Sequence, residues 1–127
     1  MADGAFATAI SCIDGRVLHP VAEFLKKKYK VDYVDAITEP GPDGILAASK
    51  DKAAIESIKR RVGISTGRHG SKHIAVVGHH DCAGNPVDKA THLAHIRSAI
   101  KTVKSWGIKA EIIGLWVDDN WKVSEVK

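Results

Sequence analysis

The chain has 127 residues, of which 44% are hydrophobic and 27% charged, and its 19 Lys and Arg exceed its 15 Asp and Glu by four. This composition is typical of one soluble globular domain over residues 1–127, and it excludes disordered, collagen-like and coiled-coil chains. Because only 6% of the residues are aromatic, the excess positive charge is better explained by solvated helix faces than by a nucleic-acid-binding surface.

The cysteine count and the apolar runs exclude further classes of protein. Two cysteines are too few for a disulfide-framed secreted miniprotein. No apolar run approaches the roughly 20 residues that span a bilayer. The amino terminus, Met1-Ala2-Asp3-Gly4, lacks the basic and apolar regions of a signal peptide. We therefore expect a cytoplasmic protein with no membrane partner.

Strand and helix patterns alternate from the amino terminus onward. Residues 6–10 (FATAI) are predicted to form a buried strand, and Pro20 is predicted to begin a helix that ends near Tyr29. Residues 31–37 (VDYVDAI) have the β-branched and aromatic content of a second strand. Residues 39–44 (EPGPDG) have the composition of a loop.

The same alternation continues through the rest of the chain. Apolar residues at helical spacing predict a helix over residues 51–62, and residues 65–71 (STGRHGS) are predicted to form a polar loop. Residues 73–78 (HIAVVG) form the clearest strand pattern, and residues 111–117 (EIIGLWV) predict a fourth strand. Turn residues follow, so residues 121–126 are expected to return as an antiparallel edge strand.

The longest helix is predicted to lie between the third and fourth strands. Asn85 is a suitable N-cap with Pro86 at the first helical position, and the helix is expected to end near Trp106 with Gly107 as its C-cap. Its buried stripe should comprise four apolar residues, Leu93, Ile96, Ile100 and Val103.

This order of elements predicts an α/β fold of three layers (αβα) with a mainly parallel sheet of order 2-1-3-4 and an antiparallel carboxy-terminal edge strand. That order places the first and third strands side by side. The crevice beyond their carboxyl ends is where ligands bind in open sheets of this kind.

Three metal-binding residue types follow those two strands. Cys12 follows the first strand, and His79 and Cys82 follow the third. Two thiolates and an imidazole are ligands that Zn²⁺ prefers, and three protein ligands with one open position are typical of catalytic zinc. The alternatives are a disulfide between Cys12 and Cys82, or buried cysteines and a loop histidine (His79 or His80) without a role.

Two charged residues of the first loop bear on the same site. The carboxylate of Asp14 is placed either to bind the metal directly or to accept a hydrogen bond from a metal-bound water. Arg16 is placed to hold Asp14 in a bidentate pair, which would keep Asp14 away from the metal. The sequence leaves these two arrangements open.

Residues 12–16 (CIDGR) and 79–82 (HHDC) together resemble the C-x-D-x-R and H-x-x-C motifs of the β-class carbonic anhydrases. The resemblance implies zinc on Cys12, His79 and Cys82, with Asp14 and Arg16 as the catalytic dyad. The implied activity is that of a zinc lyase (carbonate dehydratase), in which metal-bound hydroxide converts CO₂ reversibly to bicarbonate. His19, His69 and His80 are candidate proton shuttles.

Two other functions keep the same metal site. One is a zinc hydrolase that acts on another small electrophile such as carbon disulfide, as some relatives do. The other is a zinc-binding or regulatory domain without CO₂ hydratase activity, in which Asp14 closes the coordination sphere. The resemblance also implies a homodimer or higher homo-oligomer, and Trp106, Trp116 and Trp121 suggest an apolar surface for self-association.

The chain departs from the family pattern at several positions. Gly15 stands where the family usually has serine, and Ala83-Gly84 stands where it usually has two glycines. Thr38-Glu39-Pro40-Gly41 stands where an Asn-Ala-Gly type of sequence is usual. The first strand is expected a few residues after Met1, without the amino-terminal helices that commonly wrap a partner subunit.

Overall fold

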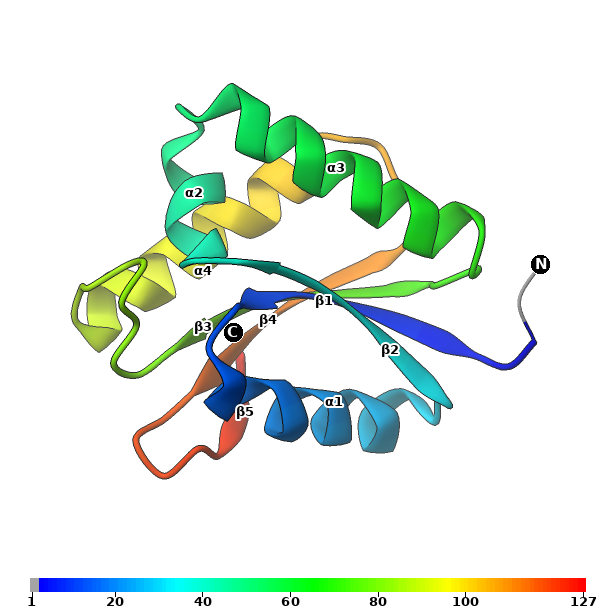
Figure 1. The fold of residues 1–127 in the computed structure, drawn as a ribbon, viewed down its shortest axis with the longest axis horizontal. Coiled ribbons are helices and arrows are strands. Elements are labelled where there is room, and N and C mark those ends of the chain that lie inside the picture. The colour runs from blue at the N-terminus through cyan, green and yellow to red at the C-terminus, as the bar shows by residue number, and fades with distance from the viewer. Residues whose placement is uncertain (1–2) are drawn as a thin grey trace.

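The computed structural model describes residues 3–127, so Met1 and Ala2 of the amino terminus considered above lie outside it. Five strands form one sheet of order β2-β1-β3-β4-β5 (Figure 1). The first four strands are parallel and β5 runs antiparallel to β4, which confirms the predicted α/β fold and strand order. The strands are β1 (Phe6–Cys12), β2 (Tyr33–Glu39), β3 (His73–His79), β4 (Glu111–Val117) and β5 (Val123–Val126).

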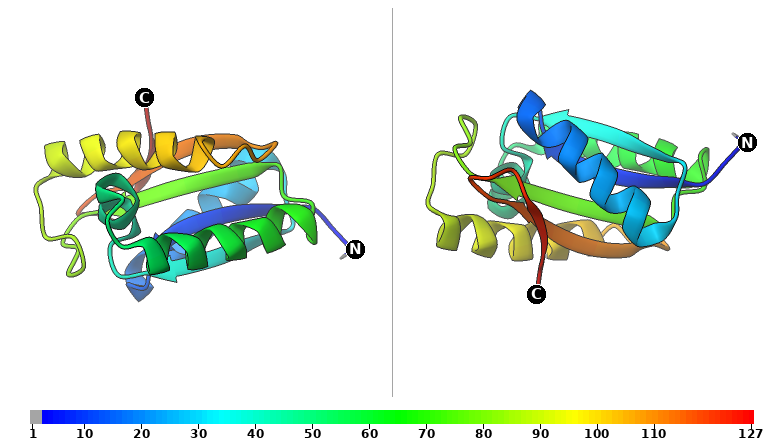
Figure 2. Two further views of the ribbon diagram at one scale, coloured as in Figure 1. Left: turned by 90° about the horizontal axis from the view of Figure 1, so that it is seen from above. Right: turned by 90° about the horizontal axis from the view of Figure 1, so that it is seen from below.

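Helices cover both faces of the sheet and complete the three layers. Helix α1 (Gly15–Tyr29) lies alone on one face, and the other three helices lie on the opposite face (Figure 2). Crossovers between parallel strands are right-handed. The chain adds β2 on one side of β1 and then β3 and β4 on the other side, so α1 lies on the opposite face from the later helices. Those later helices are α2 (Pro42–Ala48), α3 (Lys52–Gly67) and α4 (Lys89–Lys104).

Strand β3 shows why the sheet is buried on both faces. Ala75 and Val77 pack in the cluster that includes α1, whereas Ile74 and Val76 pack in the cluster that includes α2, α3 and α4. All four side chains are fully buried. Alternate residues of a strand point to opposite faces, so a continuous apolar run is what a central parallel strand requires.

Helix α1 begins five residues earlier than predicted. Its N-cap is Asp14, whose side chain accepts a hydrogen bond from the backbone N–H of Arg16 at 2.9 Å. Pro20 lies inside the helix and not at its first position. A proline in the second turn removes one backbone hydrogen bond. The burial of Val17 together with Val21 offsets that loss, because both contact the sheet.

The prediction for the start of α4 is also wrong. Its N-cap is Asp88, which accepts a hydrogen bond from the Thr91 N–H at 2.8 Å, whereas the side chain of Asn85 is used elsewhere. The helix ends at Lys104 with Ser105 as its C-cap, so the prediction of Gly107 as the C-cap is wrong; Gly107 lies two residues further on, with a φ of 72°. Of the predicted stripe, Ile96 and Val103 are fully buried, whereas Leu93 and Ile100 are partly buried. His92 and Ala99 complete the buried face of α4.

Two segments predicted as loops are partly helical. Residues 42–48 form α2, where Pro42 occupies the first helical turn that proline tolerates. Helix α3 continues through Ser65 to Gly67, because the Ser65 hydroxyl is buried and hydrogen-bonded to Thr8 at 2.6 Å. A satisfied polar side chain therefore continues the buried face of α3 beyond the last apolar residue.

The tryptophans do not form the exposed apolar surface that their late clustering suggested. Trp116 is buried, and Trp106 and Trp121 are partly buried against the two core clusters. The more exposed large apolar side chains include Ile13 and Leu18. None of the helices in residues 3–127 has both the length and the apolar character that a membrane crossing requires.

Candidate metal centre

Cys12, His79 and Cys82 converge at the carboxyl ends of β1 and β3. Cys12 and His79 are the last residues of their strands, and Cys82 follows in the loop that leads toward α4. Their ligand atoms all lie within 4.8 Å of one another, and all three residues are buried. The parallel pairing of β1 with β3 therefore brings together residues that are about seventy positions apart in the sequence.

The spacing of the two sulfur atoms fits a tetrahedral metal ion. The Sγ atoms of Cys12 and Cys82 lie 3.9 Å apart, and both cysteines are free. Zinc–sulfur bonds of about 2.3 Å at tetrahedral angles separate two sulfurs by about 3.8 Å. A disulfide requires about 2.05 Å, so this geometry does not contain the alternative disulfide.

His79 has one ring nitrogen in use and one free. Nδ1 donates to the backbone carbonyl of the adjacent His80 at 2.6 Å, which leaves Nε2 as the unprotonated nitrogen of the neutral ring. Nε2 is buried and, among residues 3–127, has no hydrogen-bond partner. A buried polar atom without a partner is costly, and a metal ion in contact with it would remove that cost.

The Cys82 thiol is protonated at neutral pH when it has no cation beside it. Burial, above all, raises the pKa of Cys82 to about 11, and the backbone amides of Asn85 and Gly84 act in the opposite direction. Metal ions bind the thiolate, so binding would displace this proton. The donor set of two buried thiols and one free imidazole nitrogen thus fits zinc better than calcium or magnesium.

Asp14 is paired with Arg16, which is one of the two arrangements that the sequence left open. Nη2 and Nε of Arg16 donate to Oδ2 and Oδ1 of Asp14 at 2.6 and 3.0 Å. The side-chain hydrogen bonds from Arg16 lower the pKa of Asp14 from 3.8 to about 2, so Asp14 is ionised at neutral pH. Its Oδ2 nevertheless lies only 4.0 Å from Nε2 of His79.

Two further residues contact Arg16, and the sequence patterns identified neither. The backbone carbonyl of Asp81 accepts from Nη2 at 3.2 Å, and the Asp81 carboxylate lies 3.4 Å from Nη1. The Trp121 ring covers the guanidinium, with Cζ 4.4 Å from the ring centroid. Asp81 lies inside the second motif, but Trp121 lies beyond β4, where only the fold brings it to Arg16.

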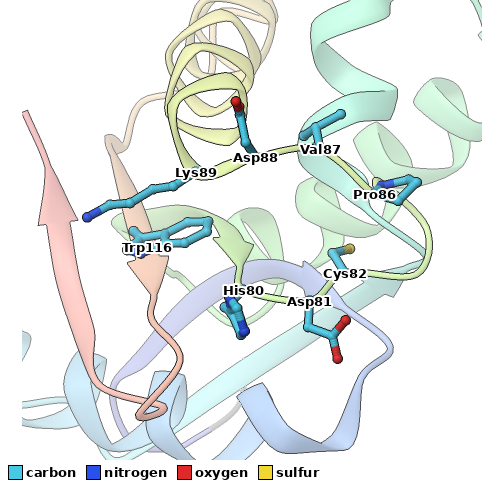
Figure 3. A pocket seen from close by; sticks show the side chains of 8 residues that line it. All are labelled: His80, Asp81, Cys82, Pro86, Val87, Asp88, Lys89 and Trp116. Atoms are coloured by element: carbon cyan, nitrogen blue, oxygen red, sulfur yellow. The ribbon is translucent and has the colours of Figure 1, made fainter.

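A cavity of about 360 Å³ lies beside Cys82 (Figure 3). The loop between β3 and α4 lines one side and Trp116 of β4 lines the other. The lining combines the apolar side chains of Pro86 and Val87 with the charged side chains of Asp88 and Lys89. The cavity gives a small molecule room next to the cysteine and histidine cluster.

A buried polar network supports the loop that carries Cys82. Nδ2 of Asn85 donates to Oδ1 of Asp43 at 3.2 Å and lies 3.0 Å from Nδ1 of His95. Nδ1 of His92 lies 2.7 Å from Oδ2 of Asp43, and both side chains are 1% exposed. Asp43 thereby joins α2 to both the metal-binding loop and α4. A histidine at a core position of a helix is the sequence signal that could have indicated this network.

The three candidate proton shuttles occupy different places. His80 is exposed beside the site and lies 6.5 Å from the Trp121 ring. His19 is exposed on α1 and pairs with Glu23 at 3.5 Å. His69 binds Asp35 and stacks on Phe6 at the start of β1, so the structure does not bring it to the metal centre.

Comparison with solved structures shows the same fold in β-carbonic anhydrases. β-Carbonic anhydrase isoform I of Trichomonas vaginalis is 16% identical with a TM-score of 0.64, and the match covers 94% of this chain and 81% of that one. A tetrameric β-carbonic anhydrase of Sordaria macrospora is 16% identical with a TM-score of 0.52, with 98% and 82% covered. A carbon disulfide hydrolase is 12% identical with a TM-score of 0.51, with 95% and 78% covered.

Sequence comparison gives the family. No curated protein matches the chain significantly. A family model described as "Putative carbonic anhydrase" matches residues 2–127, which is nearly the whole chain. The chain therefore belongs to this carbonic anhydrase family, and its fold is that of the β-class enzymes.

Proposed function

We propose that the chain binds one zinc ion through Cys12, His79 and Cys82 and catalyses the reversible hydration of CO₂ to bicarbonate. The observation that supports this most strongly is the buried Nε2 of His79, which has no hydrogen-bond partner among the described residues and lies beside two free thiols. Membership of a carbonic anhydrase family supports the reaction class, a zinc lyase or carbonate dehydratase.

Zinc in this site would supply Lewis acidity, which lowers the pKa of a water molecule toward neutrality. The two thiolates would offset the charge of the ion, and the hydrogen bond from His79 to the His80 carbonyl would keep Nε2 turned to the metal. Asp14, ionised and held by Arg16, would accept a hydrogen bond from the reacting water and orient it toward CO₂. The exposed ring of His80 would pass the released proton to solvent.

Metal analysis and a stopped-flow CO₂ hydration assay test the proposal together. Purified protein should contain close to one zinc per chain and should accelerate CO₂ hydration above buffer from neutral to alkaline pH. Cys82→Ser and His79→Ala should lose both zinc and activity. His69→Ala makes the same change at the opposite end of the sheet and should retain both. Zinc-loaded protein with no activity above buffer would refute the hydration reaction.

Two other functions remain outcomes of the same measurements. The fold likeness to a carbon disulfide hydrolase supports hydrolysis of a small electrophile other than CO₂, so carbon disulfide should be assayed in parallel. Zinc binding without turnover of either substrate would instead identify a zinc-binding domain. In that case Asp14 should be found on the metal, in contrast to its pairing with Arg16.

We also propose that the protein forms a homodimer or a larger homo-oligomer in the cytoplasm. The tetrameric enzyme of Sordaria macrospora, which shares the fold, supports self-association. The two free cysteines support the cytoplasmic location, because Cys12 and Cys82 must stay reduced to bind zinc and the cytoplasm is a reducing compartment. Light scattering coupled to size exclusion should give at least twice the mass of one 13.7 kDa chain.

A further inference from the structure

Two residues with unfavourable backbone conformations meet at Arg16. Four non-glycine residues in the described part of the chain have positive φ: Lys30, Ser49, Asp81 and Trp121. Lys30 and Ser49 are C-caps of helices, where the left-handed conformation is common. Asp81 (φ 57°) and Trp121 (φ 60°) cap no helix, and both contact the Arg16 guanidinium. Such strain persists only where surrounding contacts enforce it, and it is frequent at functional sites.

The contacts enclose the guanidinium of Arg16 on its edges and on one face. The edge formed by Nε and Nη2 binds Asp14. The opposite side binds Asp81 through its backbone carbonyl and its carboxylate. The Trp121 ring covers a face, with Cζ 4.4 Å from its centroid. An arginine held in three directions has little freedom to turn away from Asp14.

The turn that carries Trp121 is held independently of Arg16. Oδ1 of Asp118 accepts hydrogen bonds from the backbone N–H groups of Asn120 and Lys122, each at 2.9 Å. The N–H of Trp121 donates to the carbonyl of Asp118 at 3.0 Å. These bonds close the connection between β4 and β5 into a tight turn. The position of Trp121 is therefore set by the turn, and the ring acts as a fixed wall against Arg16.

We propose that Asp81 and Trp121 are positioning residues that clamp Arg16 and thereby keep Asp14 from becoming a fourth metal ligand. This inference rests on the proposed metal site. Oδ2 of Asp14 lies 4.0 Å from Nε2 of His79, so a carboxylate released from Arg16 is close enough to compete for the metal. The clamp leaves that position to water or substrate and keeps the Asp14 carboxylate as a hydrogen-bond acceptor.

Cobalt(II) is the probe, because its visible spectrum reports the ligand set without any assay of activity. Thiocyanate titrated into the cobalt-loaded protein measures how readily an external anion takes the open position. Trp121→Leu keeps an apolar side chain but removes the π face, and cation–π contacts at partly exposed sites are worth enough to weaken thiocyanate binding about three- to tenfold. Trp121→Phe keeps a π face and should stay within about twofold of the unmodified protein.

A second substitution separates the clamp from a general structural effect. Asp14→Ser keeps an N-cap acceptor for α1 but removes the carboxylate. In the Trp121→Leu background, Asp14→Ser should restore thiocyanate affinity, because no carboxylate remains to occupy the metal. Unchanged affinity in Trp121→Leu, or weakened affinity that Asp14→Ser leaves weak, would overturn the inference. A protein that binds no cobalt would refute the metal site itself. A protein that binds cobalt but does not hydrate CO₂ would refute only the proposed reaction, and the thiocyanate titrations would still decide whether the clamp exists.

Discussion

Asp43 joins helix α2 to the loop that carries Cys82 and to helix α4. Its removal should therefore lower the stability of the fold more than most substitutions outside the metal centre would. It accepts from Nδ2 of Asn85 at 3.2 Å and lies 2.7 Å from Nδ1 of His92. Asp43→Ala would leave the His92 ring nitrogen without its partner at a position that is 1% exposed. Asn85 would keep its contact with His95, so its loss would be smaller.

The size of the effect follows from burial. A buried polar group left without a partner costs about 1–3 kcal/mol, and Asp43 is the partner of two such groups, on Asn85 and His92. We therefore expect the free energy of unfolding to fall by about 2–4 kcal/mol. With an unfolding entropy of roughly 2.1 cal/mol/K per residue over 127 residues, this lowers the melting temperature by about 7–15 °C.

Urea and thermal unfolding of the metal-free protein measure this loss without any contribution from bound metal. Asp43→Asn, which keeps an acceptor of the same shape, should lose less stability than Asp43→Ala. In a double-mutant cycle with His92→Leu, the two losses should be strongly non-additive, because each substitution removes the same contact. A loss below 1 kcal/mol for Asp43→Ala, or additive losses in the cycle, would refute the network as a source of stability.

Three further predictions concern packing, metal uptake and acid stability. Gly78→Ala would bring a Cβ atom to 2.8 Å from Oδ2 of Asp43 and should lower the free energy of unfolding by about 1–3 kcal/mol. As the control, a Cβ atom on Gly63 would meet nothing within 4 Å in the described structure, so Gly63→Ala should stabilise helix α3 by about 0.5–1 kcal/mol. Because the pKa of Cys82 is about 11 without metal, zinc uptake should release protons and its affinity should rise with pH; calorimetry in buffers of different ionisation enthalpy measures the release, and zero release would contradict the prediction. The pKa of Asp14 is lowered to about 2, so its pairing stabilises the fold above about pH 4 and this contribution is lost as the pH falls toward 2. Its arginine partner is 46% exposed, so the contribution should stay below about 1 kcal/mol. The stability difference between the unmodified protein and Asp14→Asn should therefore shrink at low pH; a constant difference would count against it.

The strand order and the cluster of metal-binding residues follow from local patterns together with one rule of topology. An apolar run that ends in Gly78-His79 is recognisable as a buried strand whatever surrounds it. Once β1 and β3 are adjacent, Cys12 must lie beside His79 and Cys82, because parallel strands end at the same edge of the sheet. Neither step depends on side-chain contacts between distant elements.

The errors arise where a tertiary contact overrides a local signal. Pro20 favours the start of a helix, but Asp14 caps α1 earlier. Asn85-Pro86 has the chemistry of a helix start, yet Asn85 is used by Asp43, and Asp88 caps α4. Trp121 could not be assigned to Arg16 from the sequence, because its role depends on the turn after β4 lying over α1. Local patterns predict the helices and strands. Contacts between those elements then decide which residue caps a helix, which forms a buried hydrogen bond and which holds a catalytic side chain in place.

The loop after Cys82 and the segment after β2 meet at one place in the structure. A Cβ atom on Gly84 would lie 2.4 Å from the carbonyl carbon of Pro40, so the loop after Cys82 packs directly on the backbone that follows β2. A Cβ atom on Gly41 would lie 2.7 Å from the carbonyl carbon of Gly84, and Gly41 has a φ of 63°, so a side chain there would be strained as well as crowded. Replacement of either glycine should displace the Cys82 loop and weaken metal binding. Gly41 and Gly84 therefore form one close backbone contact that joins the Cys82 loop to the segment after β2, beside the two sulfur atoms that lie 3.9 Å apart.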